Sequence, residues 1–100
     1  MEKVSRMLLS QESAETVALQ GLAWLAGNEE LLPVFLGSTG ASEADLRARA
    51  TDPEFLLSVL DFLMLDDAWV IGFCDTYSMS YEQPMQARHT LPGGAPTHWT

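Results

Sequence analysis

DPEFLLSVLDFLMLDD, residues 52–67, is the stretch that decides the fold. It opens with Asp52 as an N-cap and Pro53 at the first helical position, two features typical of a helix start. The apolar residues that follow lie almost all round a helix, which predicts a buried central helix. Asp66 and Asp67 then predict the start of another helix. Because no alternating apolar–polar run predicts a strand, the fold class is all-α.

Two longer helices are predicted on the N-terminal side of this stretch. The apolar spacing of residues 11–26 predicts a helix that starts after Ser10 and ends at Gly27. Asn28 can cap the next helix. Pro33 is tolerated only in a first helical turn, so this second helix either starts a residue or two after Asn28 or opens with an irregular turn. We favour the later start.

Capping signals predict two shorter helices. The run from Ser42 to Asp45 resembles a capping box and predicts a short helix to Ala50. The run Ser80-Tyr81-Glu82-Gln83 is a second such box and predicts a helix to about Thr90. Residues 91–94, Leu-Pro-Gly-Gly, then stop the helix. Val4, Met7 and Leu8 lie at helical spacing and are compatible with a short helix before residue 10.

Sliding the sequence along itself by 38 residues gives an ungapped match. Apolar positions coincide, and so do the acidic N-cap and the capping-box serine. The matched positions are Leu19, Leu22, Trp24, Leu25, Asn28, Phe35 and Ser42 with Leu57, Leu60, Phe62, Leu63, Asp66, Phe73 and Ser80. Each unit exposes an apolar face that it cannot bury alone. We therefore predict a compact bundle of about six short helices in two related three-helix units, forming one domain over residues 1–94 with a tail at 95–100.

The chain has 100 residues, which suits one domain, and 14 acidic against 5 basic residues give a net charge of −9. This charge repels phosphate and anionic lipid, so nucleic acid and membranes are poor partners and a basic patch on a protein is a better one. The longest apolar run, residues 55–65, is too short to span a bilayer. Cys74 is the single cysteine, which excludes an intramolecular disulfide and favours a cytoplasmic location.

Three segments carry a resemblance to known proteins: LQGLAWLAGNEELLPVFLGSTG (19–40), EADLRARATDPEFLLSVLDFLMLDD (43–67) and LPGG (91–94). Residues 18–94 as a whole resemble a family of small uncharacterised bacterial proteins, classed as a domain of unknown function. The family's FL..TG stretch is kept at residues 35–40, and the sequence departs from the family at Pro33. The resemblance implies a compact helical fold in a bacterial cytoplasm, and it implies no activity, ligand or catalytic residue.

Several residue groups resemble chemical sites, and each has a simpler explanation. Asp61, Asp66 and Asp67 form the densest acidic cluster, but Asp61 and Asp66 are five residues apart and face different ways on a helix. Cys74 with His89 suggests a nucleophile and its base, yet Cys74 falls on a predicted buried face. His98, in the tail, has no metal-binding partner nearby in the sequence. We therefore expect no catalytic, cofactor or metal site, and no enzyme.

Candidate partner contacts remain at two places. Residues 42–47 have the outline of a DNA-recognition helix that would present Arg47 and Arg49, although acids stand where base-reading residues belong and a plain helical hairpin has the same outline. Tyr77, Met79 and Tyr81 cluster at the turn between the last two helices. Tyr and Met are enriched at interfaces, and ordinary packing is the alternative.

Two classes of function follow from these features. The first is a non-enzymatic module that binds a partner protein or a second copy of itself. The alternative is a small-ligand domain with a pocket between the two units, which would be expected to have Arg47, Arg49 or Arg88 in its lining. A helix-turn-helix DNA binder is a distant third.

Overall fold

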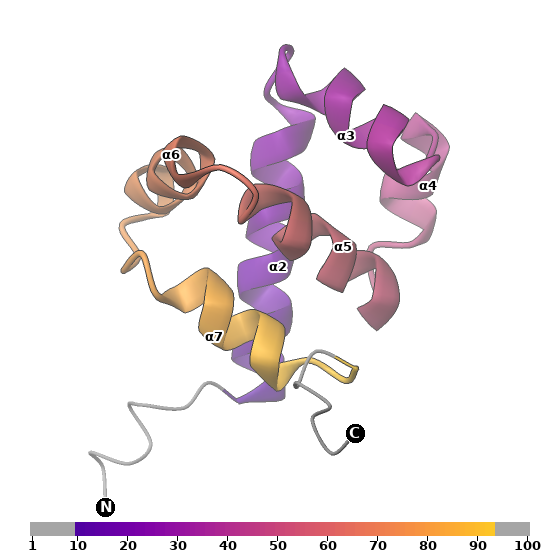
Figure 1. The fold of residues 1–100 in the computed structure, drawn as a ribbon. Helices are drawn as coiled ribbons and strands as arrows, with labels where there is room; N and C mark the ends of the chain where they lie inside the picture. The colour runs from indigo at the N-terminus through magenta and orange to yellow at the C-terminus, as the bar shows by residue number, and fades with distance from the viewer. Residues whose placement is uncertain (1–9, 94–100) are drawn as a thin grey trace, which may run out of the picture.

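The computed structural model describes residues 10–93, and within them every regular element is a helix. Figure 1 shows these elements in chain order. The helices are α2 (Gln11–Ala26), α3 (Leu31–Thr39), α4 (Glu43–Ala48), α5 (Pro53–Leu63), α6 (Asp67–Tyr77) and α7 (Gln83–Thr90). The predicted all-α bundle is confirmed. The predicted helix around Val4 and the tail at 95–100 lie outside the described residues.

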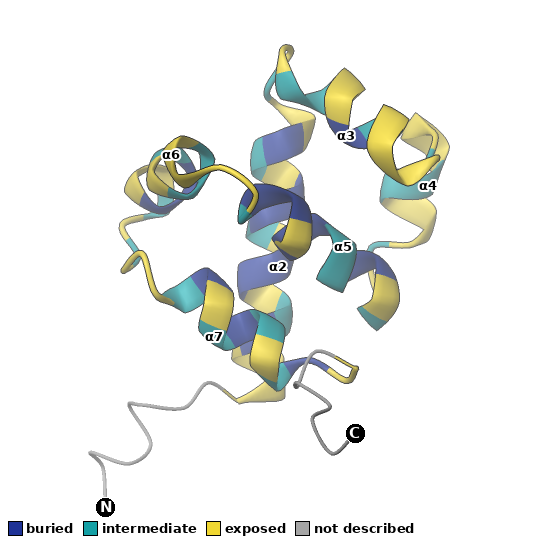
Figure 2. Ribbon diagram, viewed as in Figure 1, coloured by how far each residue is buried: buried dark blue, intermediate teal, exposed yellow. Residues whose placement is uncertain are grey.

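The core forms where α5 crosses α2 (Figure 1). Six of the 11 residues of α5 are buried, as expected for a helix that is apolar almost all round. The two helices approach closely at Gly21, where a Cβ atom would lie 3.0 Å from Cδ1 of Leu63. Figure 2 shows the buried residues concentrated along α5 and the middle of α2. They are Phe55, Leu56, Val59, Leu60, Phe62 and Leu63 of α5 and Ala14, Val17, Ala18, Gly21, Leu22 and Leu25 of α2.

Aromatic residues attach the flanking helices to this core. Phe35 is the single buried residue of α3, and its ring meets Phe55 and Phe62 edge-on at centroid distances of 5.9 and 5.3 Å. Phe73 of α6 occupies the equivalent position in the second unit and is also fully buried. Trp69 stacks on Phe62 at 4.9 Å but remains half-buried, as does Trp24.

The capping side chains Asn28 and Asp66 coincide at the predicted 38-residue offset, but α3 begins three residues after Asn28 whereas α6 begins one residue after Asp66. The Asn28 side-chain oxygen accepts hydrogen bonds from the amides of residues 30 and 31, both at 3.0 Å, and Asp66 accepts one from the amide of residue 68 at 2.8 Å. The helix after Asn28 begins at Leu31, which keeps Pro33 in its first turn, as expected. Gly40 ends that helix with φ = 74°, a left-handed conformation that suits glycine.

Two predicted helix boundaries are wrong. Both groups of the Ser42–Asp45 capping box are in place, but α4 ends at Ala48 and not at Ala50, because the chain turns at Arg49. The second box is only half formed: Gln83 accepts a bond from the Ser80 amide at 3.3 Å, and no side chain caps α7 within the described residues. That helix therefore starts at Gln83, where Pro84 takes an early position.

The two units differ most in their short third helices. α7 packs extensively on α2 and buries Pro84 and Ala87. The corresponding helix α4 buries no residue and stands at the edge of the bundle (Figure 2). An open groove results between α4 and α2.

Candidate functional site

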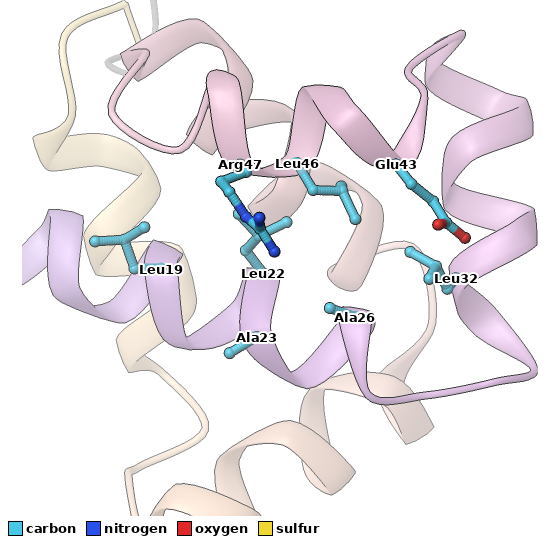
Figure 3. Close-up of a pocket in the computed structure, with 8 residues that line it drawn as sticks. All are labelled: Leu19, Leu22, Ala23, Ala26, Leu32, Glu43, Leu46 and Arg47. Atoms are coloured by element: carbon cyan, nitrogen blue, oxygen red, sulfur yellow. The ribbon is translucent and has the colours of Figure 1, made fainter.

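The groove between α2 and α4 has a cavity volume of about 490 Å³. Its floor is apolar and comes from four positions of α2 together with Leu32 of α3 and Leu46 of α4 (Figure 3). Leu22 at the bottom is 7% exposed, whereas Leu19 at one end is 41% exposed. The α2 positions are Leu19, Leu22, Ala23 and Ala26. The lining combines this apolar floor with polar surface in similar amounts, so only the floor of the half-open channel leaves hydrophobic surface in contact with water.

Both charged residues of the groove belong to α4. Glu43 and Arg47 are one helical turn apart, and Figure 3 shows Glu43 near Leu32 while the Arg47 side chain reaches toward Leu22. Within residues 10–93, no ion pair joins Arg47 to an acidic residue. The groove therefore offers both a carboxylate and a guanidinium to a molecule that occupies it.

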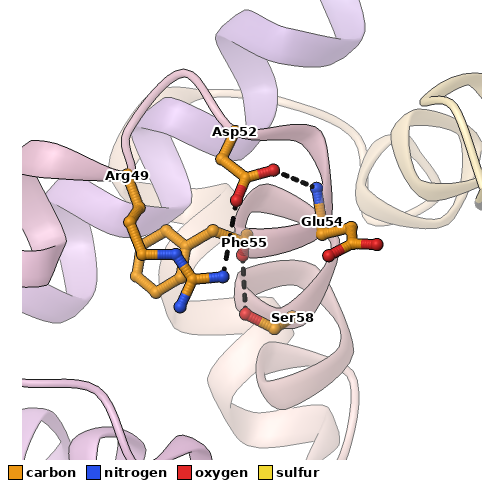
Figure 4. A network of polar contacts seen from close by, with 5 residues as sticks. All are labelled: Arg49, Asp52, Glu54, Phe55 and Ser58. Atoms are coloured by element: carbon orange, nitrogen blue, oxygen red, sulfur yellow. Dashed lines mark hydrogen bonds and ion pairs between the residues drawn. The ribbon is translucent and has the colours of Figure 1, made fainter.

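Arg49, the second predicted contact, is engaged in local structure. Its guanidinium lies 3.4 Å from a carboxylate oxygen of Asp52 and 4.9 Å from the centre of the Phe55 ring (Figure 4). Asp52 in turn accepts a bond from the Glu54 amide at 3.0 Å, and so caps α5. Arg49 thus helps to hold the link between α4 and α5, and it does not line the groove.

The predicted corner of Tyr77, Met79 and Tyr81 lies on the other side of the bundle from α4 (Figure 1). Tyr77 packs edge-on against Phe73 at 5.4 Å, and Met79 is half-buried against the core. Tyr81 is 54% exposed, and its hydroxyl donates a 2.8 Å hydrogen bond to Asp75. That bond and the charge of Asp75 raise the pKa of Tyr81. Of the three, only Tyr81 is an exposed residue.

The residues considered for chemistry have structural roles. Asp61 pairs with Arg88, and Asp66 caps α6. Among the described residues, no three His, Cys, Asp or Glu side chains gather in a metal-binding arrangement. Cys74 is buried, its thiol donates to the Ser80 carbonyl at 3.5 Å, and burial followed by the charge of Asp75 raises its pKa. His98 lies outside the described residues.

Two further pockets lie on the described part of the chain. One of about 490 Å³ lies where the first unit meets Thr76 of α6, and Trp24, Glu29 and Glu30 are among its lining residues. This pocket lies between the two units, and none of the three arginines expected there lines it. Another pocket, of about 310 Å³, also lies between the units, with Ser38 and Thr39 on one side and Ser58 and Leu65 on the other, and it is likewise lined by none of these arginines. The hydroxyls of Ser38 and Thr39 both donate to the Phe35 carbonyl, so they serve the end of α3.

A family model described as "Protein of unknown function (DUF3572)" matches residues 11–94, which cover all six described helices and the Leu-Pro-Gly-Gly stop. The chain belongs to this family. The resemblance seen in residues 18–94 is therefore confirmed, and the family model extends it to the start of α2. No curated protein and no solved structure matches the sequence. Within the part of the chain that the structure describes, none of the helices has the length and apolar character needed to cross a membrane.

Proposed function

We propose that this protein is a non-enzymatic interaction module that takes an apolar segment of a partner protein into the α2–α4 groove. The observation that carries the proposal is the unfilled apolar floor along Leu19, Leu22 and Ala26, next to a helix that buries none of its own residues. Grooves between two helices commonly accept the apolar face of a third. Covering this floor would release the water now in contact with it.

Charge favours a different protein over a second copy of this chain. Each copy carries a net charge of −9, so two copies repel one another at low salt. The paired state of Arg49 and Arg88 leaves few cations to offset that repulsion. Light scattering at moderate salt, which screens this repulsion, tests whether two copies associate nonetheless.

A small amphiphilic anion is the second candidate occupant. Arg47 has no acidic partner within the described residues, and the volume of about 490 Å³ falls in the range of small-molecule sites. Native mass spectrometry of the purified protein tests this candidate. A bound mass that disappears in the Arg47→Ala variant would favour the small ligand over a protein partner.

Site-specific photo-crosslinking in the protein's own cells tests the proposal. The photoreactive amino acid p-benzoylphenylalanine replaces Ala26 in the groove or, as a control, Ala48, which is exposed on α4 and lines none of the three pockets. We expect a discrete protein adduct from position 26 and none from position 48. Equal adducts from both positions, or none from position 26, would overturn the groove as the binding surface.

A further inference from the structure

One face of α2 continues the groove beyond its apolar floor. Glu15, Leu19, Leu22 and Ala26 follow one another at spacings of four, three and four, so they form one stripe along the helix. At 1.5 Å per residue, the stripe is about 16 Å long from Glu15 to Ala26. A partner helix of about three turns has the length to cover it.

The charges around this stripe are mostly negative. Glu15 lies at one end of it, Glu43 faces it from α4, and Glu29 and Glu30 line the pocket that shares Ala23 with the groove. Arg47 is the one basic residue among those that line either cavity. Carboxylates therefore outnumber basic groups in the neighbourhood of the apolar floor.

The rest of the described chain strengthens this field. Every acidic residue of the sequence except Glu2 lies within residues 10–93, whereas Lys3 and Arg6 lie outside them. Of the arginines inside, Arg49 and Arg88 are paired with acids. Such a field attracts positively charged segments and rejects negatively charged ones of the same shape.

From these observations, and resting on the proposed function of the groove, we infer that the partner segment is a basic amphipathic helix. Its apolar face covers Leu19, Leu22, Leu32 and Leu46, and Lys or Arg residues on its flanks meet Glu15 and Glu43. Apolar burial supplies most of the affinity, because exposed ion pairs add little each. The carboxylates make the groove specific for basic over acidic partners and raise the association rate.

Two synthetic peptides test this inference. One is a helix of about four turns built from Leu and Lys, and the other has the same Leu positions with Glu in place of every Lys. Binding of each labelled peptide to the full chain is measured by fluorescence anisotropy at low and moderate salt. We expect the Lys peptide to bind at least about tenfold more tightly than the Glu peptide, with the difference shrinking as salt rises.

Variants separate binding in the groove from general attraction to an acidic protein. Ala26→Trp fills the groove without changing the net charge and should weaken the Lys peptide about tenfold, whereas Ala48→Trp on the outer face of α4 should not. Glu43→Gln should weaken it and Arg47→Glu should tighten it, each by about two- to fivefold. Circular dichroism confirms that each variant retains the wild-type helix content.

Each alternative result contradicts a distinct statement. Equal binding of the two peptides, lost in Ala26→Trp, would overturn the basic character of the partner and leave the groove intact. The inference would be overturned if the Lys peptide bound the Ala26→Trp variant as tightly as the wild type, or if neither peptide bound. The crosslinks from position 26 decide the proposed function separately, because they need no assumption about the partner's charge.

Discussion

Phe35 is the main anchor of α3 on the core, with Leu31 and Leu36 packing beside it as partly buried residues. It is the single buried residue of that helix, and it sits between the rings of Phe55 and Phe62. Its neighbour Val34 is 51% exposed. Two adjacent apolar residues are therefore expected to differ in their effect on stability, because Phe35 is fully removed from water on folding whereas Val34 stays about half exposed.

Replacing Phe35 by Ala should lower the free energy of unfolding by about 3–5 kcal/mol, through lost burial and the cavity that remains. Val34→Ala is the matched control and should change it by less than about 0.5 kcal/mol. Urea denaturation followed by circular dichroism measures both. Similar midpoints for the two variants would contradict the anchoring role of Phe35.

Cys74 makes stability depend on pH at the alkaline end. Burial, and then the charge of Asp75, raises its pKa above the ordinary value of 9.0. The unfolded chain therefore loses the thiol proton first, so the contribution of Cys74 is complete below pH 9 and decreases as pH rises past it. Tyr81 shifts in the same direction.

We expect the free energy of unfolding to fall as pH rises past about 9, and to fall less steeply in Cys74→Ala. Urea titrations at a series of pH values compare the slopes, which do not depend on the cavity that Ala leaves. Tyr81 is present in both proteins, and most of its contribution cancels from the comparison because the charge of Cys74 is the smallest of the causes that raise its pKa. Parallel slopes would show that the native environment does not disfavour the thiolate.

At the scale of the helix, α4 depends on its cap more than any other described element. It has six residues and none of them is buried, so packing contributes little to it. Its start is held by the reciprocal bonds between Ser42 and Asp45 at 3.3 and 3.0 Å. One wall of the groove therefore rests on a surface hydrogen-bond pair.

Ser42→Ala should cost about 1 kcal/mol in the local stability of α4. Hydrogen exchange of the amides of Leu46 and Arg47 should become about fivefold faster, while the amides of α5 remain protected. Ser80→Ala is the control, since within the described residues no side chain caps α7. Equal effects at the two serines would contradict the assignment.

For the molecule as a whole, charge repulsion opposes folding. The excess of acids gives −9 over 100 residues, and only Arg49 and Arg88 are recorded in ion pairs within the described chain. Raising sodium chloride from about 10 to 200 mM should screen this repulsion and raise Tm by about 3–5 °C. Thermal denaturation in choline chloride of equal ionic strength is the control for ion-specific effects. An unchanged Tm would show that the acids are too widely spaced to interact.

Local signals in the sequence account for most of the helices, and contacts distant in sequence account for what was missed. Asp52, Asn28 and Asp66 mark helix starts because a cap acts within three residues, and such short-range chemistry is visible in sequence. The end of α4 and the half-open position of Leu19 depend instead on how far α4 stands from α2. Nothing near Leu19 in sequence distinguishes it from Leu57, its partner in the repeat.

The residues of the candidate site also divide into those that the sequence marks and those that only the structure reveals. Arg47 was singled out from its charge and lines the groove, but Ala23 and Ala26 line it because they are small and face a gap, which no sequence pattern marks. The predicted repeat does not distinguish the third helices of the two units. In the structure Pro84 and Ala87 of α7 are buried, whereas Leu46 of α4 is only half-buried.

The packing of α2 against α7 also has a consequence for synthesis on the ribosome. α2 emerges first, yet one of its principal neighbours is the last described helix, which is made more than 55 residues later. At about 5–20 residues per second, its apolar face waits several seconds for that cover. A nascent chain stalled before α7 therefore displays this face to chaperones and proteases. Copies truncated before α7 are therefore expected to be degraded faster than copies that contain it.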